Sequence, residues 1–359
     1  MKRFAGCLAA ALWCAGLTFS PAASGAAQER AVWMKELFPV ERDGKWGFID
    51  SKGTIVIPLR YEGAHHFSEG LAAVKLDGRF GYINESGTMV IRPQFNWAVW
   101  FREGLAWVRV NAPRREGFID KTGEIVVSPP DATSCLDFRE GLAVAWPHRI
   151  NVPVEFERKT GFIGKTGRYA IEPKFDTANE FSEGLAAASV KGKWGFIDPK
   201  GEFVILPLYD DAGYFHEGAA AVKLLGKRTF IRKDGTLLFD QQFDDTAGFR
   251  EGLALVKLDG KWGFVDKTGA FVIKPIYERA DSFFNDRAGV MVNGKWGYIN
   301  GRGEVAVEPK YASGHFFLGE LAKVTHHPER GDGSWSGYID REGREVWPPR
   351  PPGYSEGRP

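Results

Sequence analysis

Glutamate recurs at one place in copy after copy of a short phrase, and paired carboxylates are common acid and base catalysts. The recurring residues are Glu69, Glu103, Glu140, Glu183, Glu217 and Glu251. An active site is needed once, whereas a residue present in copy after copy is expected to cap a turn by accepting backbone N–H bonds. We therefore interpret these glutamates as structural and predict no catalytic residue and no enzyme activity.

Histidine pairs are the candidates for a metal site. His65 and His66 are adjacent, as are His326 and His327. Neighbouring residues on a strand point to opposite faces, and no cysteine or carboxylate stands at a ligand-like spacing. We expect surface histidines, no metal and no cofactor. The chain also lacks a glycine-rich phosphate loop after a strand and a Gly-x-Ser-x-Gly sequence.

Three tryptophans break the repeat and are candidates for binding. Trp97, Trp100 and Trp107 stand where the preceding copy has Gly63, His66 and Ala73. Stacking of copies does not explain them, so they are candidates for an exposed aromatic platform that binds a glycan, a peptide or a partner surface. The structural alternative is a locally overfilled core or a cap.

The elements that hold these residues are repeats. The phrase Gly-Lys-Trp-Gly-Phe-Ile-Asp returns nine times with a period of about 34 residues, which indicates stacked copies of one supersecondary unit. A turn glycine follows six residues after the second glycine of the phrase, as expected where φ must be positive. These glycines are Gly53, Gly87, Gly123, Gly167, Gly201, Gly235, Gly269, Gly303 and Gly343.

Each copy is predicted to be a three-stranded antiparallel meander. In the copy that starts at Leu253, strands are expected over 253–258, 261–266 and 270–273, separated by an Asp-Gly turn and a Lys-Thr-Gly turn, and ended by Pro275. The connection onward, from an aromatic residue to Glu-Gly, is expected to be a folded loop with a short helical turn. The fold class is therefore all-β, with about nine such meanders.

Whether the array is open or closed depends on its two ends. The first copy starts with its own first strand, 37–42, and the last ends with its own third, 345–347. No strand is held back to complete a unit at the other terminus. We therefore expect an open, solenoid-like array, and a closed propeller-like ring is the alternative.

The ordered set of Trp-Gly-aromatic-Ile-Asp, turn glycine, proline and Glu-Gly-Leu-Ala resembles the WG-repeat, or KWG-repeat, family of bacterial proteins from about residue 37 to 347. Repetition makes the motif tryptophans expected core aromatics between copies: Trp46, Trp194, Trp262 and Trp296. Four copies depart from the motif, with Glu116, Thr160, Arg228 and Ser336 at the tryptophan position, and Thr229 replaces a glycine. The resemblance implies an interaction scaffold, often in exported or envelope proteins.

The two ends of the chain differ from the repeats, and the N-terminal end indicates where the protein acts. Residues 1–27 have basic Lys2 and Arg3, an apolar run and small residues, which predicts a signal peptide cleaved near Ala26 or Ala27. A lipid anchor at Cys7 or Cys14 is the competing interpretation. The array then occupies 28–347, and 348–359 is predicted to be a disordered tail rich in proline and glycine.

The composition limits the kinds of partner that are expected. The mature chain would keep only Cys135, so no internal disulfide is expected, and it has no transmembrane segment. With a net charge of +1, the chain lacks the excess of basic residues that nucleic-acid binding requires, so no nucleic-acid partner is expected.

Insertions into the repeat give a second candidate surface. They fall around 111–115, 147–159 and 325–335, at the first hairpin turn of their copies, and bring Arg114, Arg115 and Arg149. Loops also tolerate insertion without a functional reason. We expect an exported periplasmic or extracellular scaffold that binds a protein or envelope component. Glycan or peptidoglycan binding through the three tryptophans is an alternative, and a hydrolase built from several copies is another.

Overall fold

The computed structural model describes residues 36–111, 114–130, 133–147, 159–326 and 335–347. The chain divides into two units, Met1–Val32 and Trp33–Pro359, and every described residue belongs to the second. The predicted signal peptide, the predicted tail, Arg149 and His327 lie outside the described residues, as does the side chain of Arg114.

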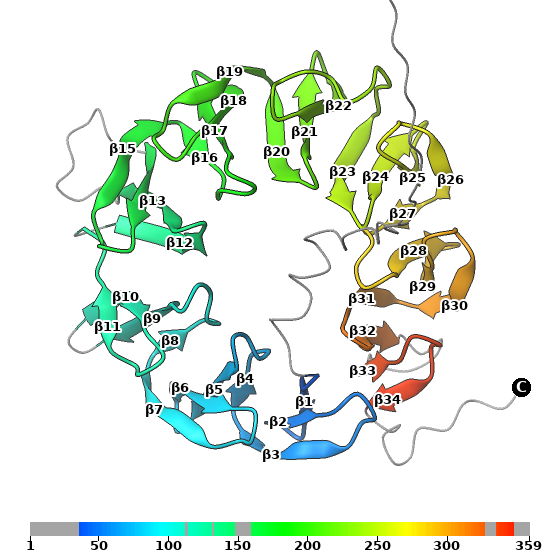
Figure 1. Ribbon diagram of the computed structural model, residues 1–359. Helices are drawn as coiled ribbons and strands as arrows, with labels where there is room; N and C mark the ends of the chain where they lie inside the picture. The colour runs from blue at the N-terminus through cyan, green and yellow to red at the C-terminus, as the bar shows by residue number, and fades with distance from the viewer. Residues whose placement is uncertain (1–35, 112–113, 131–132, 148–158, 327–334, 348–359) are drawn as a thin grey trace, which may run out of the picture. The chain divides into compact units, whose positions relative to one another are not determined.

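The described residues form nine antiparallel sheets of three or four strands, which we call blades 1 to 9 (Figure 1). Blades 1 to 3 are β1 (Phe38–Arg42), β2 (Lys45–Ile49), β3 (Ile55–Tyr61); β4 (Gly63–Ala64), β5 (Leu71–Leu76), β6 (Arg79–Asn84), β7 (Met89–Phe95); and β8 (Trp97–Ala98), β9 (Ala106–Asn111), β10 (Arg114–Ile119), β11 (Ile125–Val127). Blades 4 to 6 are β12 (Thr133–Arg139), β13 (Leu142–Pro147), β14 (Thr160–Gly164), β15 (Tyr169–Phe175); β16 (Thr177–Ala178), β17 (Ala186–Val190), β18 (Lys193–Ile197), β19 (Phe203–Tyr209); and β20 (Asp211–His216), β21 (Ala219–Leu224), β22 (Lys227–Arg232). Blades 7 to 9 are β23 (Asp245–Arg250), β24 (Leu253–Leu258), β25 (Lys261–Val265), β26 (Phe271–Tyr277); β27 (Arg279–Ala280), β28 (Ala288–Val292), β29 (Lys295–Ile299), β30 (Val305–Tyr311); and β31 (Ser313–Leu318), β32 (Leu321–His326), β33 (Trp335–Ile339), β34 (Glu345–Trp347). The all-β prediction is confirmed.

The connection between copies is a strand, and the expected helical turn is wrong. It pairs with the next copy's first strand and becomes the innermost strand of that blade, as Ala98 does opposite Val108. Glu-Gly is the tight turn of this hairpin, because Glu69 and Gly70 both have positive φ, of 51° and 83°, as a two-residue type I′ turn requires. No residue in the described ranges is helical. The three predicted strands per copy are therefore joined by a fourth in most blades.

The second glycine of the motif is needed for space. In blade 7, Gly263 stands opposite a bulge in the outer strand β26 that contains Pro275. A Cβ at Gly263 would lie 2.6 Å from the Ile273 oxygen and from the Pro275 nitrogen. In blade 6 the glycine is replaced by Thr229, and there the outer strand is reduced to isolated bridges. The departure from the motif at Thr229 thus coincides with a local change in the outer strand.

Neighbouring blades pack through a repeated aromatic pair. A phenylalanine lies two residues before each Glu-Gly turn, or before the residues that replace Glu-Gly. Its ring contacts the motif aromatic of the preceding blade, with ring centroids 4.7–5.0 Å apart. The pairs are Phe48–Phe67, Tyr82–Phe101, Phe118–Phe138, Phe162–Phe181, Phe196–Phe215, Phe230–Phe249, Phe264–Phe283 and Tyr298–Phe317. The motif tryptophans Trp46, Trp194, Trp262 and Trp296 are partly buried against these inter-blade clusters.

Blades 1 and 9 pack against each other, so the array is a closed nine-bladed propeller and the expected open array is wrong (Figure 1). Their shared core contains Phe38, Val40, Ile49, Leu321, Tyr338 and Trp347. The Tyr338 hydroxyl donates a hydrogen bond to the Pro39 oxygen at 3.1 Å. The turn of Gly53 meets Val346 of blade 9, just as the turn of Gly87 meets Ile57 of blade 1. Closure needs no shared strand, because it buries the two apolar blade faces that an open array would leave in water.

Candidate functional site

One position, on the innermost strand or just after it, differs in every blade from 2 to 9. It immediately precedes the stacking phenylalanine, which is the same residue in all eight. The residues here are His66, Trp100, Asp137, Glu180, Tyr214, Gly248, Ser282 and Phe316, and we call them the rim residues. The phenylalanine is buried in the core between blades, whereas the rim residue beside it takes no part in that aromatic pair. Trp100, Tyr214 and Phe316 are 43%, 46% and 49% exposed.

Charged rim residues pair with arginines of the preceding blade. Arg102 of blade 3 lies 4.0 Å from Asp137 of blade 4, and Arg139 of blade 4 lies 3.3 Å from Glu180 of blade 5. Both arginines directly follow the stacking phenylalanine. Burial raises the pKa of Asp137, against the opposing influence of Arg102, Arg139 and a hydrogen bond from Trp100. The rim from blade 3 to blade 5 is thus a connected polar network that includes Trp100.

Two of the three predicted tryptophans belong to one aromatic row. Trp97 lies 6.4 Å from Phe80, Phe80 lies 5.8 Å from His65, and His65 lies 6.4 Å from Trp100, all between ring centroids. Burial in this row lowers the pKa of His65. We call these four residues the aromatic row. Its members come from the neighbouring blades 2 and 3, and Trp97 and Trp100 are its exposed ends, at 47% and 43%.

Trp107 lies outside the aromatic row. Its ring is 4.9 Å from that of Phe118, and it packs against the core between blades 3 and 4. This is the overfilled-core alternative for that residue.

The strand ends that flank the first insertion lie away from the Glu-Gly turns. Asn111 at the end of β9 pairs with Arg114 at the start of β10, at the opposite end of these strands from the Glu-Gly turn. Arg115 is exposed there. The structure therefore does not bring Arg115 together with Trp100.

The recurring glutamates join neighbouring blades. Glu69 accepts the backbone N–H of Gly104, the turn glycine of the next blade, at 3.1 Å, and Glu217 accepts that of Gly252 at the same distance. A lysine adds to the contact, such as Lys267, whose Nζ is 3.3 Å from Glu217. The expected capping role is present, but the capped turn belongs to the following copy.

Of the predicted histidine pairs, His65 and His66 belong to blade 2 and His326 to blade 9. The pKa of His66 is lowered to about 4 by burial, by Lys323 of blade 9 and by His65. His326 packs its ring 4.8 Å from that of Tyr311. Within the described ranges no group of three or more His, Cys, Asp or Glu residues is arranged to hold a metal ion. Those ranges also contain no helix long and apolar enough to cross a membrane.

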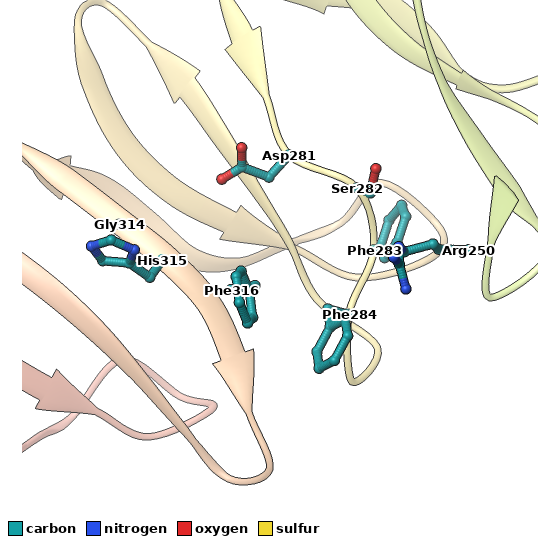
Figure 2. Close-up of a pocket in the computed structure, with 8 residues that line it drawn as sticks. All are labelled: Arg250, Asp281, Ser282, Phe283, Phe284, Gly314, His315 and Phe316. Atoms are coloured by element: carbon teal, nitrogen blue, oxygen red, sulfur yellow. The ribbon is translucent and has the colours of Figure 1, made fainter. Parts of the chain in front are cut away.

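A hollow of about 470 Å³ opens between blades 7, 8 and 9 (Figure 2). It is lined by Arg250, Asp281, Ser282, Phe283, Phe284, Gly314, His315 and Phe316. Sequence reasoning missed it, although aligning all copies at the rim position reveals that Phe316 replaces the polar or small residues found in most other blades. A further exposed apolar surface is the outer strand of blade 5, where Leu206 and Leu208 are 64% and 63% exposed.

A protein-family model described as WG containing repeat matches the chain eight times. The matches cover residues 46–80, 80–112, 117–145, 161–194, 194–227, 229–262, 262–296 and 296–326. No curated protein matches the chain.

Solved structures resemble this fold at low sequence identity. A crystal structure of "the eukaryotic initiation factor" has a TM-score of 0.54 at 15% identity, over 75% of this chain and 80% of that one. Kluyveromyces lactis Hsv2p has a TM-score of 0.40 at 10% identity, over 76% and 94%. AztD from Citrobacter koseri has a TM-score of 0.32 at 12% identity, over 86% and 84%. At these identities the likeness concerns the fold alone.

Proposed function

This chain belongs to the family of proteins built from WG-containing repeats, and we propose that it is a binding scaffold that holds a protein or a cell-envelope component on its rim residues. Catalysis is not part of the proposal. The scaffold acts outside the cytoplasm, in the periplasm or beyond the cell, after removal of residues 1–27 as a signal peptide.

The observation that carries the proposal is the contrast between two adjacent positions. Eight blades have the same phenylalanine for stacking and eight different residues beside it. A position needed for blade packing keeps one residue, as the phenylalanine does. A position that contacts an irregular partner needs a different group at each point of contact, and aromatic and arginine side chains are the usual anchors of such contacts.

The test is affinity capture from a cell-envelope extract with the Trp97→Ala, Trp100→Ala variant beside the parent. The matched control is Leu206→Ala, Leu208→Ala, which removes two exposed apolar side chains from the outer strand of blade 5. We expect a component that the parent and the control retain and that the tryptophan variant loses. Retention by all three proteins would contradict a site at blades 2 and 3.

Glycan binding is the second candidate function, and the aromatic row favours it. A row of rings with exposed tryptophans at both ends offers flat apolar faces against which the C–H faces of sugar rings pack, while Asp137 and Arg102 beside Trp100 offer hydrogen-bonding groups. Tryptophan fluorescence titrated with peptidoglycan fragments tests this candidate. An unchanged spectrum at millimolar fragment would count against it, and a shift that disappears in Trp100→Ala would support it.

A further inference from the structure

Two of the arginines that follow the stacking phenylalanine have an internal carboxylate partner. Arg102 pairs with Asp137, and Arg139 pairs with Glu180. In both pairs the carboxylate is the rim residue of the next blade. The arginine of one blade therefore binds the carboxylate of the rim residue of the next blade, within the same chain.

Arg250 of blade 7 is an arginine at this position that lacks such a carboxylate partner. It occupies the same position after Phe249, but the rim residue of blade 8 is Ser282, which carries no charge. Among the described residues no carboxylate forms an ion pair with Arg250. Its guanidinium lies instead 6.0 Å from the centre of the Phe284 ring.

Ser282 stands where blades 4 and 5 have a carboxylate, and both Ser282 and Arg250 line the hollow shown in Figure 2. Phe284 and Phe316 line it with ring centroids 5.1 Å apart, and Phe316 is 49% exposed. Figure 2 shows Arg250 and Ser282 at one end, with His315 at the other. A cation beside two phenyl rings fits a ligand that has a carboxylate and an apolar group close together.

We propose that this hollow binds a carboxylate that bears an aromatic or large apolar group. Arg250 receives the carboxylate in the place that Asp137 and Glu180 occupy in blades 4 and 5, and Phe284 and Phe316 contact the apolar group. The inference rests on the proposed use of the rim for binding, which it extends to blades 7 to 9. Two sources supply such a group: a small organic acid, or the C-terminus of a peptide.

The test is ligand-observed NMR titration of the full chain with N-acetyl-phenylalanine and with its amide. A second pair of probes, Gly-Gly-Gly-Phe with a free or an amidated C-terminus, distinguishes the two sources. Binding of the small acid alone assigns the site to small acids, and binding of the peptide acid assigns it to peptide termini. The free acid is expected to bind at least ten-fold more tightly than its amide, because a charge-assisted pair with Arg250 is lost in the amide. Equal binding of acid and amide, or no binding of either acid, would overturn the proposal.

Two variants test the place of the carboxylate. Arg250→Ala removes the cation, and Ser282→Glu restores the internal partner found in blades 4 and 5, so each is expected to weaken binding at least ten-fold. Ser282→Gln adds the same bulk without charge and should be at least five-fold less damaging than Ser282→Glu. Arg302→Ala, an exposed arginine of blade 8, is the control expected to bind as the parent does. Full affinity in Ser282→Glu would also overturn the proposal.

These titrations use defined ligands, so they do not depend on the envelope partner. Failure of the tryptophan variant to change capture would leave the Arg250 result standing, and the reverse also holds.

Discussion

The buried hydroxyl of Tyr338 donates a hydrogen bond to the backbone oxygen of Pro39, 299 residues earlier in the chain. The two residues belong to blades 9 and 1, and the contact crosses the seam of the propeller. Tyr82 and Tyr298 hold the equivalent place in their blades and donate to Val99 and His315 of the following blade, each at 2.7 Å. The seam is therefore joined by the same kind of contact as blades that are adjacent in sequence.

Tyr338→Phe tests the closure. We expect it to lower the free energy of unfolding by about 1–2 kcal/mol, because the Pro39 oxygen loses its buried donor. Tyr298→Phe is the matched control and should cost a similar amount. Urea denaturation measures both. A loss in Tyr298→Phe with none in Tyr338→Phe would indicate an open seam.

Gly263→Ala tests the reason for the motif glycine. Its Cβ would lie 2.6 Å from backbone atoms of β26, so we expect a loss of about 2–3 kcal/mol or failure to fold. Thr229 already has a Cβ at this place in blade 6. Thr229→Ala should cost no more than about 1 kcal/mol, mainly the hydrogen bond from its hydroxyl to Gln241. Thermal denaturation compares the two, and equal losses would contradict the spatial argument.

The low pKa of His66 predicts a pH dependence of stability. Its pKa is about 4 in the folded chain and 6.5 ordinarily, so between these values the unfolded chain binds the proton and the folded chain does not. Stability should therefore be complete above pH 6.5 and fall as pH drops toward 4, by about 2 kcal/mol after allowing for partial exposure. His66→Gln should remove this part of the pH dependence.

The control for that experiment is Leu206→Ala, which replaces an exposed side chain that has no titratable group. Its stability should follow the parent's between pH 4 and 6.5. A His66→Gln profile parallel to the parent's would show that His66 does not titrate as described.

Glu217→Ala tests the structural role of the recurring glutamates. The variant loses the acceptor for Gly252 N–H and the partner of Lys267, so we expect about 1–2 kcal/mol less stability. Glu202→Ala, which removes an exposed glutamate 3.8 Å from Lys174, should cost less than about 0.5 kcal/mol. Chemical denaturation measures both variants. Unchanged stability in Glu217→Ala would revive a chemical role for these residues.

The strands could be predicted from the repeat, because nine copies of one motif indicate the same local structure nine times. Its turn glycines were located from spacing alone, and all nine have φ between 77° and 92°. The innermost strand was missed because its pairing segment is as short as two residues, such as Gly63–Ala64, and it pairs with the following copy. Closure was missed because it depends on the angle between blades, which no residue pattern encodes locally.

The candidate site was predictable only in part. Trp97 and Trp100 were found because they break the repeat, but Trp107 breaks it too and packs inward on Phe118. Departure from a motif therefore identifies unusual residues without giving their direction. The rim position was visible in the sequence as a variable residue before a constant phenylalanine, but its place on the innermost strand or just after it came from the structure.

Photo-crosslinking tests the central claim, that the rim residues bind the partner, most directly. A benzophenone amino acid would replace Trp100, Tyr214 or Phe316 on the rim, or Leu206 on the outer strand of blade 5 as the control, in cells that produce the protein. We predict a crosslink to one common partner from at least two of the rim positions and none from Leu206. Crosslinks from Leu206 with none from the rim would contradict the account.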